Sequence, residues 1–210
     1  MAGFAFGTII LGRVDKVGKQ SIRTKFFILG FPLFPIKSFY FLSDLDNVSQ
    51  AIPIRMNGKS VAAGYLRILA PFLTIMMLVF VYTNRDFLFL SLGLLGVALF
   101  LSTYLFGILS DEEKERRQLL IEATGIGADP KVLYEDMSAE ILSKLENKWN
   151  ESDAAPSHRN WRHVLSLSGM ETHLYPLLYS LTRYAGEEDQ AEQVWENYKK
   201  PNAGYVPESS

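Results

Sequence analysis

Residues 87–109, FLFLSLGLLGVALFLSTYLFGIL, indicate the fold of this chain, because they run for 23 positions without a charged side chain. As a helix the segment would be roughly 35 Å long, which is enough to cross the apolar core of a bilayer. Residues 68–82 are also uncharged but form a shorter run of 15. This run reaches spanning length when it is extended back to residue 61, with the guanidinium of Arg67 reaching the lipid headgroups. A re-entrant or interfacial helix is the alternative for this first segment.

The two apolar segments, 61–82 and 87–109, are predicted to form a transmembrane helical hairpin, because only a short turn separates them. Five residues at spacings of three and four place small side chains on one face of the second helix and predict its packing face. These residues are Gly93, Gly96, Phe100, Thr103 and Gly107. We expect this face to pack on the first helix. A homodimer contact or a groove for a larger partner uses the same pattern and stays open.

Basic residues on both sides of the hairpin predict its orientation. The expected membrane-surface residues are Arg55, Lys59 and Arg67 before the first helix and Lys114, Arg116 and Arg117 after the second. The turn between the helices offers only Arg85. Because basic residues are enriched on the cytoplasmic side, both termini are predicted to be cytoplasmic. The expected partners are the lipid bilayer and another membrane protein or a second copy of this chain.

Residues 1–60 are predicted to form a small, mostly antiparallel β domain. Segments 8–17 and 21–29 flank a short turn, and the second of them alternates apolar and polar side chains. A third segment, 31–42, contains Pro32 and Pro35, so we expect regular pairing only from residue 37 to 42. Asn57 and Gly58 predict a two-residue hairpin turn before the first helix.

Nine aromatic residues lie between positions 4 and 41, and most are expected in the core of the β domain. Alternatively, some of them form a basic and aromatic face that rests on anionic lipid headgroups. The basic residues of that face would be Arg13, Lys16, Lys19, Arg23, Lys25 and Lys37. A platform for single-stranded nucleic acid uses the same residue types, but no ribonucleoprotein motif is present and we expect no nucleic-acid partner.

The carboxy-terminal part has a different character and is predicted to be a helical cytoplasmic domain over residues 111–200, with a flexible tail at 201–210. Residues 1–110 carry ten basic and four acidic side chains, a net charge of +6, whereas residues 111–210 carry eleven and nineteen, a net charge of −8. A helix capped at Ser110 or Asp111 should run to Thr124 and end at Gly125. Whether it continues the second span stays open at this point. Asp129 and Pro130 should begin an amphipathic helical segment over 130–149. Three further helical segments are expected at 161–167, 171–184 and 187–198, with a kink at Pro176 in the middle one.

Few residues are candidates for chemistry. The chain has no cysteine, which excludes a disulfide scaffold, a thiolate metal site and a cysteine nucleophile. The remaining candidates for metal or general-base chemistry are His158, His163 and His173, with Glu171. They show neither an i,i+4 histidine pair nor an HExxH pattern. We therefore assign no catalytic, cofactor-binding or metal-binding residue and predict no enzyme activity.

Three short segments occur as a set: Thr-x-Phe-Phe at residues 24–27, Pro-Leu-x-Pro-x-x-Ser at 32–38, and Ser-Val-x-x-x-Tyr-Leu-Arg at 60–67. Together they resemble the segments of an uncharacterised family of small two-span membrane proteins. The resemblance covers roughly residues 7–110. It implies a two-span anchor and brings neither an activity nor a catalytic residue.

The sequence thus predicts an α+β membrane protein with a small antiparallel β domain, a two-helix transmembrane hairpin and a helical tail domain. The expected function is an integral membrane anchor, an adaptor or an accessory subunit of a membrane protein complex. The alternative is a membrane-bound enzyme or ligand-binding protein with a site between the β domain and the tail, using Glu171, His163 or His173.

Overall fold

The fold is α+β. The computed structural model describes residues 6–29, 32–43, 51–84, 87–152, 160–164 and 172–202. The chain divides into two compact units, Met1–Ser110 and Asp111–Ser210, and each is described by itself. The predicted β domain and helical hairpin, expected as two domains, together make up the first unit.

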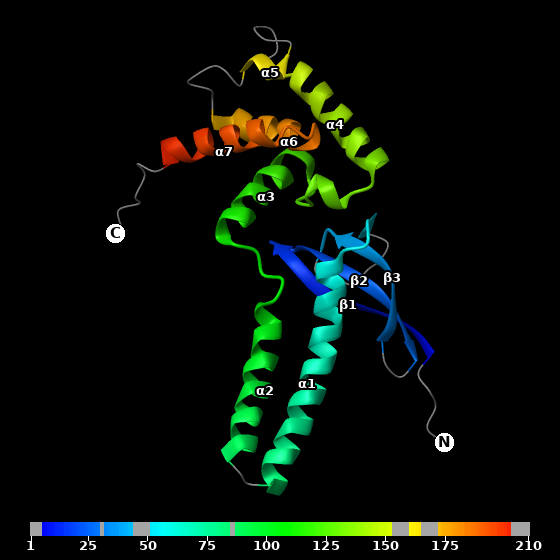
Figure 1. Ribbon diagram of the computed structural model, residues 1–210. Helices are drawn as coiled ribbons and strands as arrows, with labels where there is room; N and C mark the ends of the chain where they lie inside the picture. Colours follow the sequence, from blue (N-terminus) through cyan, green and yellow to red (C-terminus); the bar gives the residue numbers. More distant parts are fainter. Residues whose placement is uncertain are drawn as a thin grey trace. The chain divides into compact units, whose positions relative to one another are not determined.

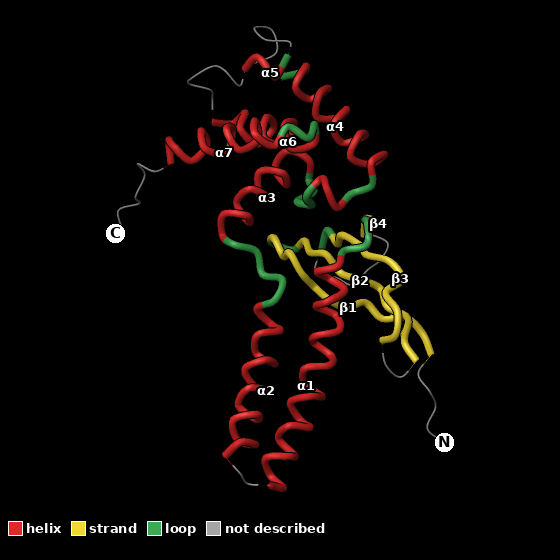
Figure 2. The backbone as a smooth tube through the Cα atoms, in the orientation of Figure 1, coloured by secondary structure: helices red, strands yellow, loops and turns green. Residues whose placement is uncertain are grey.

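Four antiparallel strands form the sheet of the first unit, in the order β1-β2-β3-β4 (Figures 1 and 2). The strands are β1 Phe6–Val17, β2 Gln20–Leu29, β3 Pro32–Phe41 and β4 Ala51–Ile54. One face of the sheet carries fully buried side chains, among them Ile22, Phe26 and Tyr40. Helix α1 contacts β1, β2 and β3, so this unit has a sheet layer and a helical layer.

Regular pairing of the third segment runs from Lys37 to Phe41, close to the predicted limits of 37 and 42, and the proline-bearing first half is irregular as expected but still pairs with the sheet. Strand β3 begins at Pro32, and Pro35 pairs with Phe26 of β2. The register shifts twice in this half of the strand, which leaves Leu33 and Ile36 as extra residues. Within the described residues β4 pairs only with Ser38 to Phe41, so the proline-bearing half of β3 is an edge in this part of the chain. An edge with bulges tolerates residues that lack a backbone donor.

The predicted hairpin turn at Asn57 and Gly58 is wrong, because helix α1 begins at Gly58. Helix α1 is Gly58–Asn84, and the side-chain Oδ1 of Asn57 accepts a hydrogen bond from the backbone N–H of Ser60 at 2.8 Å. Asparagine is a favoured residue at a helix N-cap because its side chain binds a free N–H of the first turn. Asn-Gly can form either a hairpin turn or the start of a helix, and the helix-forming residues that follow favour the helix.

Helices α1 and α2, Phe87–Leu105, lie antiparallel in the first unit (Figure 1). Among the described residues one helix, Gly58–Thr83, is long and apolar enough to cross a membrane, whereas Gly93–Leu105 is apolar but shorter. Helix α2 ends at Leu105 and not at residue 109, and Gly107 has a φ of 90°. It does not continue into the next helix, because residues 106–110 separate the two.

The second unit consists of helices around a central one. Its elements are α3 Asp111–Thr124, η2 Pro130–Val132, α4 Glu135–Asn150, α5 Trp161–Val164, η3 Thr172–Leu174, α6 Tyr175–Tyr184 and α7 Glu188–Asn202. Helix α6 contacts α3, α4 and α7 and buries eight of its ten residues. The core includes the fully buried Trp149, Leu178, Leu181 and Trp195.

Local signals in the second unit were informative. The carboxylate of Asp129 caps η2 by accepting from the N–H of Lys131 at 2.9 Å, and Pro130 is the first residue, as predicted. Pro176 lies in the first turn of α6 and starts the helix, whereas a kink was expected. The flexible tail predicted at 201–210 begins two residues later at the earliest, because Pro201 and Asn202 belong to α7. Residues 203–210 and 165–171 lie outside the described residues.

Candidate functional site: the junction of sheet and helical hairpin

Strand β1 carries two bulges at the point where it meets the helices. Its pairing with β2 shifts by one residue between Leu11 and Val14 and again between Val14 and Val17. The extra residues coincide with two left-handed backbone positions, Gly12 with a φ of 70° and Asp15 with a φ of 53°. Bulges bend a strand and redirect its backbone groups. Here they direct residues 12–15 toward both helices of the hairpin.

The first bulge contacts the start of α1. The hydroxyl of Ser60 donates to the carbonyl of Gly12 at 2.6 Å, and a side chain at Gly12 would overlap the carbonyl of Ser60. Ser60 in turn accepts from the hydroxyl of Thr24 at 2.9 Å, which lies 2.8 Å from the hydroxyl of Ser38. All three hydroxyl residues are fully buried. This polar network joins β1, β2 and β3 to the first turn of α1. Because each buried hydroxyl has a hydrogen-bond partner only in this packing, the network fixes how the sheet and α1 pack together.

The second bulge contacts the end of the hairpin. The N–H of Asp15 donates to the carbonyl of Gly107 at 2.9 Å, and its carboxylate pairs with the ammonium of Lys59 at 2.6 Å. A side chain at Gly107 would overlap that of Val14. Asp15 is only 6% exposed and holds a positive φ, a conformation that residues other than glycine adopt infrequently.

Arg67 completes the contact between the sheet and both helices. Its guanidinium donates to the carbonyl of Arg13 at 2.8 Å and to the carbonyl of Phe106 at 3.2 Å. We expected this side chain to extend to lipid headgroups, whereas it joins β1 to the segment that follows α2. We call residues 12–15, Lys59, Ser60, Arg67 and Gly107 the junction.

The predicted packing face of α2 is divided between two neighbours. A Cβ atom on Gly93 would lie 2.8 Å from Val81 of α1, and one on Gly96 would lie 2.9 Å from the sulfur of Met77. The residues of this face are placed as follows: Gly93, Gly96 and Thr103 are buried, Phe100 is partly exposed and contacts Tyr104, and Gly107 lies beyond α2 against the sheet. The glycines of α2 therefore allow close approach to α1 within the same chain.

The six predicted membrane-surface basic residues are not equivalent. In the first unit Arg55 is exposed, Lys59 pairs with Asp15, and Arg67 lies in the junction. In the second unit Lys114 pairs with Asp111, Arg116 with Glu112 and Glu192, and Arg117 with Glu113. The charges after the hairpin are thus largely engaged in ion pairs within the second unit.

The histidine candidates are only partly placed. His173 is exposed and lines an open pocket of about 790 Å³ in the second unit, together with Glu122, Lys148 and Glu151. Glu171, His158 and the side chain of His163 lie outside the described residues. Among the residues that the structure describes, no group of three acidic or histidine side chains could hold a metal ion.

A charged cluster around Trp195 joins α3 to α7 in the second unit. The indole N–H of Trp195 donates to Glu112 at 2.9 Å, and the guanidinium of Arg116 lies 5.0 Å from the centre of the indole ring. Arg116 also donates to Glu192 and Glu112. Hydrogen bonds from Arg116 and then Trp195 lower the pKa of Glu112 to about 2, and the bonds to Glu192 and Glu112 raise the pKa of Arg116.

We expect Glu112→Gln to lower the stability of the second unit at pH 7 but not near pH 2. The folded pKa of Glu112 lies at about 2, below its ordinary value of 4.5, so its carboxylate contributes stability that is complete above pH 4.5. That contribution is lost as the pH falls through about 2. Denaturant unfolding at several pH values, followed by tryptophan fluorescence, measures it, because all three tryptophans belong to this unit.

Glu140→Gln is the matched control, since Glu140 pairs only with Lys144 at an exposed i,i+4 position of α4 in the described structure. Exposed ion pairs of this kind contribute little to the free energy of unfolding, so this variant should change stability little at any pH. The stabilising role of the Glu112 carboxylate would be contradicted if Glu112→Gln and the unmodified chain had equal free energies of unfolding at pH 7. It would also be contradicted if a difference at pH 7 persisted unchanged at pH 2.

Sequence reasoning missed the central residues of the junction. A glycine inside a predicted strand is a signal for a bulge or a close backbone approach, and Gly12 carried that signal. Nothing in the local sequence indicates that Asp15 adopts a positive φ or that Ser60 faces the sheet.

Comparison of the chain with protein-family models, with curated proteins and with solved structures found no match. The resemblance to a two-span family therefore stays a prediction, and function is argued from the residues themselves.

Proposed function

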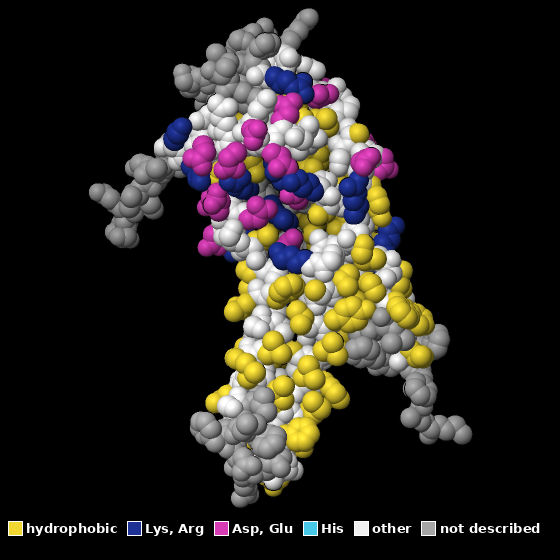
Figure 3. All heavy atoms as spheres, in the orientation of Figure 1, with side chains coloured by type: hydrophobic (Ala, Val, Ile, Leu, Met, Phe, Trp, Pro, Cys, Tyr) yellow, Lys and Arg dark blue, Asp and Glu magenta, His cyan; other side chains and the backbone are white. Residues whose placement is uncertain are grey.

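We propose that this chain is an integral membrane protein in which α1 and α2 both span the bilayer as a hairpin and anchor the sheet at the membrane surface. The observation that carries the proposal is the exposed apolar surface of the hairpin (Figure 3). Large apolar side chains that are at least half exposed include Phe72, Ile75, Val79, Leu94, Leu95, Leu101 and Leu105. Soluble monomers rarely expose a continuous apolar surface of this extent.

The length and polarity of the helices support the proposal. Helix α2 has 19 residues without a charge, and about 20 residues are enough to cross a bilayer core. Hydroxyl groups in the hairpin bind carbonyls: Thr74 donates to Gly96 at 3.0 Å and Thr103 to Phe100 at 2.7 Å. Polar groups in lipid need such internal partners. Arg67, the one charged residue between residues 60 and 84, lies in the junction near one end of the hairpin.

The two helices are antiparallel, so the sheet and the segment leading to α3 would be on the same side of the membrane, with both termini cytoplasmic. The junction would hold the sheet in a constant orientation relative to the hairpin. We infer that the protein acts as an adaptor or accessory subunit that presents its sheet and helical unit to another membrane protein.

A topology experiment tests the anchor directly, because the chain has no cysteine and single cysteines can be introduced without background. The positions are Lys19 in the β1–β2 turn, Lys144 on the exposed face of α4, Thr83 at the turn of the hairpin, and Ile75 and Leu95 on the apolar surface. A membrane-impermeant maleimide is applied to intact cells and to inverted vesicles.

We expect Thr83→Cys to react only from outside, Lys19→Cys and Lys144→Cys only from the cytoplasmic side, and Ile75→Cys and Leu95→Cys only after detergent is added. Reaction of Thr83→Cys and Lys19→Cys from the same side would show a re-entrant hairpin and overturn the two-span arrangement. Reaction of both apolar positions in intact membranes would overturn membrane insertion itself.

A further inference from the structure

One end of the sheet exposes apolar side chains and carries few charged ones. This free end comprises residues 6–10, 25–29 and 32–37, and it contains no acidic residue and only two charged ones, Lys25 and Lys37. Four large apolar side chains on it are exposed: Ile9 at 40%, Leu29 at 40%, Phe34 at 65% and Ile36 at 48%. A strand end in water usually carries polar side chains on its solvent face.

The free end points in the direction in which the hairpin extends. Ser60 of α1 contacts Gly12, and about one turn further along α1 a Cβ atom on Gly64 would lie 2.7 Å from Phe26 and 3.5 Å from Leu11. The ring of Tyr65 then packs edge-on against Phe26, with 5.3 Å between the ring centres. Progress along α1 is therefore progress toward the free end, and Figure 1 shows the strands descending beside α1.

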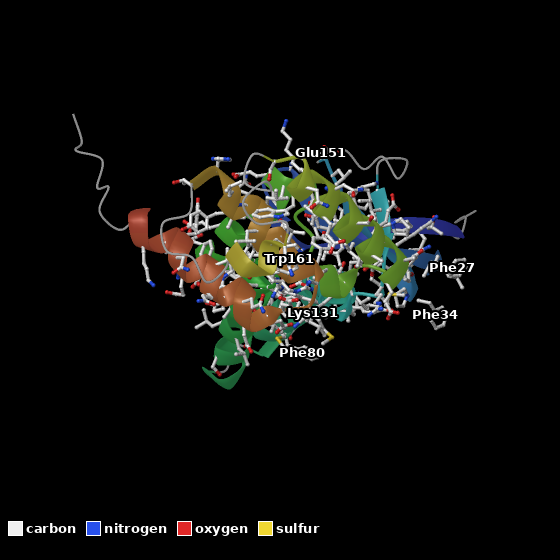
Figure 4. All side chains as sticks on the ribbon, turned by 90° about the horizontal axis from the view of Figure 1, so that it is seen from above. Phe27, Phe34, Phe80, Lys131, Glu151 and Trp161 are labelled. Carbon is white, nitrogen blue, oxygen red and sulfur yellow. The ribbon has the colours of Figure 1, made fainter. Side chains whose placement is uncertain are left out.

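The two lysines lie directly opposite each other on neighbouring strands. Lys25 of β2 pairs with Lys37 of β3, and the next pair on the same face is Phe27 with Phe34. Figure 4 shows Phe27 and Phe34 at the outer end of the sheet, pointing away from the helices. Like charges in opposed positions destabilise a sheet unless an anion lies between or near them. Within the described residues no salt bridge joins either lysine to a carboxylate.

We propose that the free end of the sheet is a second membrane contact, in which Leu29, Phe34 and Ile36 insert at the headgroup boundary and the Lys25–Lys37 pair binds the phosphate of an anionic lipid. The inference rests on the proposed anchor, because the hairpin brings this end to the bilayer. The apolar side chains continue the exposed apolar surface of α1, and the paired lysines complement the charge of the lipid phosphates.

The test uses the full chain in vesicles of phosphatidylcholine with and without phosphatidylserine. A single cysteine at Phe34, Lys19 or Leu95 is labelled with an environment-sensitive fluorophore, and quenching by lipids that carry a nitroxide near the headgroup or deeper in the acyl chain is measured. We expect the label at residue 34 to be quenched by the shallow nitroxide, the label at 95 by the deep one, and the label at 19 by neither.

Lys25→Glu combined with Lys37→Glu tests the lysines. The double variant replaces one like-charge pair by another, so the repulsion across the strands is matched while attraction to anionic lipid is reversed. We expect quenching at residue 34 to fall by about twofold or more in vesicles that contain phosphatidylserine, and to change less in phosphatidylcholine alone. Equal changes in both vesicle types would overturn the role of the lysines.

Three outcomes distinguish this inference from the anchor itself. Quenching at 95 without quenching at 34 would overturn the second contact and leave the anchor intact. Quenching at neither position would overturn both. A label at 34 that is shielded from water but insensitive to nitroxide lipids would show that protein, such as a second copy, covers the free end, and would also overturn the inference.

Discussion

Gly12→Ala is expected to lower the free energy of unfolding of the first unit by about 2–5 kcal/mol. Gly12 has a φ of 70°, which costs an alanine backbone strain, and the added methyl group would overlap the carbonyl of Ser60. The methyl can be accommodated only if α1 moves away from β1. That movement would lengthen the hydrogen bond from the Ser60 hydroxyl to Gly12 and disturb the buried network through Thr24.

The change is measured by thermal unfolding of the purified chain in detergent, followed by circular dichroism. Tryptophan fluorescence serves as an internal control, because it reports only on the second unit. We expect the dichroism transition of the first unit to move to lower temperature while the fluorescence transition stays in place.

Gly18→Ala separates strain from close contact. Gly18 also has a positive φ, 57°, but nothing lies within 4 Å of the position that its Cβ would occupy. Gly18→Ala should therefore lower the free energy of unfolding by only about 1 kcal/mol, which is the effect of the backbone conformation alone. Equal losses for the two variants would show that close packing between β1 and α1 contributes nothing, and would contradict the junction as described.

Trp195→Ala is expected to lower the stability of the second unit by about 3–5 kcal/mol, as is typical of a buried tryptophan replaced by alanine. The side chain is fully buried. Its ring stacks on Tyr198 with 5.7 Å between centres and lies 6.3 Å from Tyr179. Its N–H is one of the groups that stabilise the carboxylate of Glu112. The substitution leaves a cavity and removes a hydrogen bond between α7 and α3.

Denaturant unfolding followed by the fluorescence of the two remaining tryptophans measures this loss. Trp195→Phe is the matched variant, since it retains an aromatic ring but has no N–H donor, and it should cost about 1–3 kcal/mol. We expect both variants to resist extraction from membranes by alkaline carbonate, because the proposed anchor belongs to the other unit. If Trp195→Ala is no more destabilising than Trp195→Phe, ring burial is not the main contribution.

Much of the fold follows from patterns that a few neighbouring residues carry. The strand limits near Thr8, Val17 and Leu29, and the capping of η2 by Asp129, were predicted because alternation and capping are local properties. The error at Asn57 and the unexpected pairing of Pro35 arose where one local signal has two structural uses. Proline is excluded from a paired centre but tolerated at a bulged edge, and asparagine suits both a turn and an N-cap.

Composition and periodicity act within one segment, so they were sufficient to predict the division into a basic apolar part and an acidic helical part, the α+β class, and the two apolar helices. The junction could not be predicted in this way, because it forms only when the unit folds. Its contacts join residues far apart in the chain: Ser60 to Gly12 across 48 positions and Arg67 to Arg13 across 54. Such contacts depend on a register shift in β1 that moves Gly12 and Asp15 toward the helices. Apart from Gly12, no residue of β1 indicates such a one-residue shift in advance, since the shift depends on the energy of the whole packed unit.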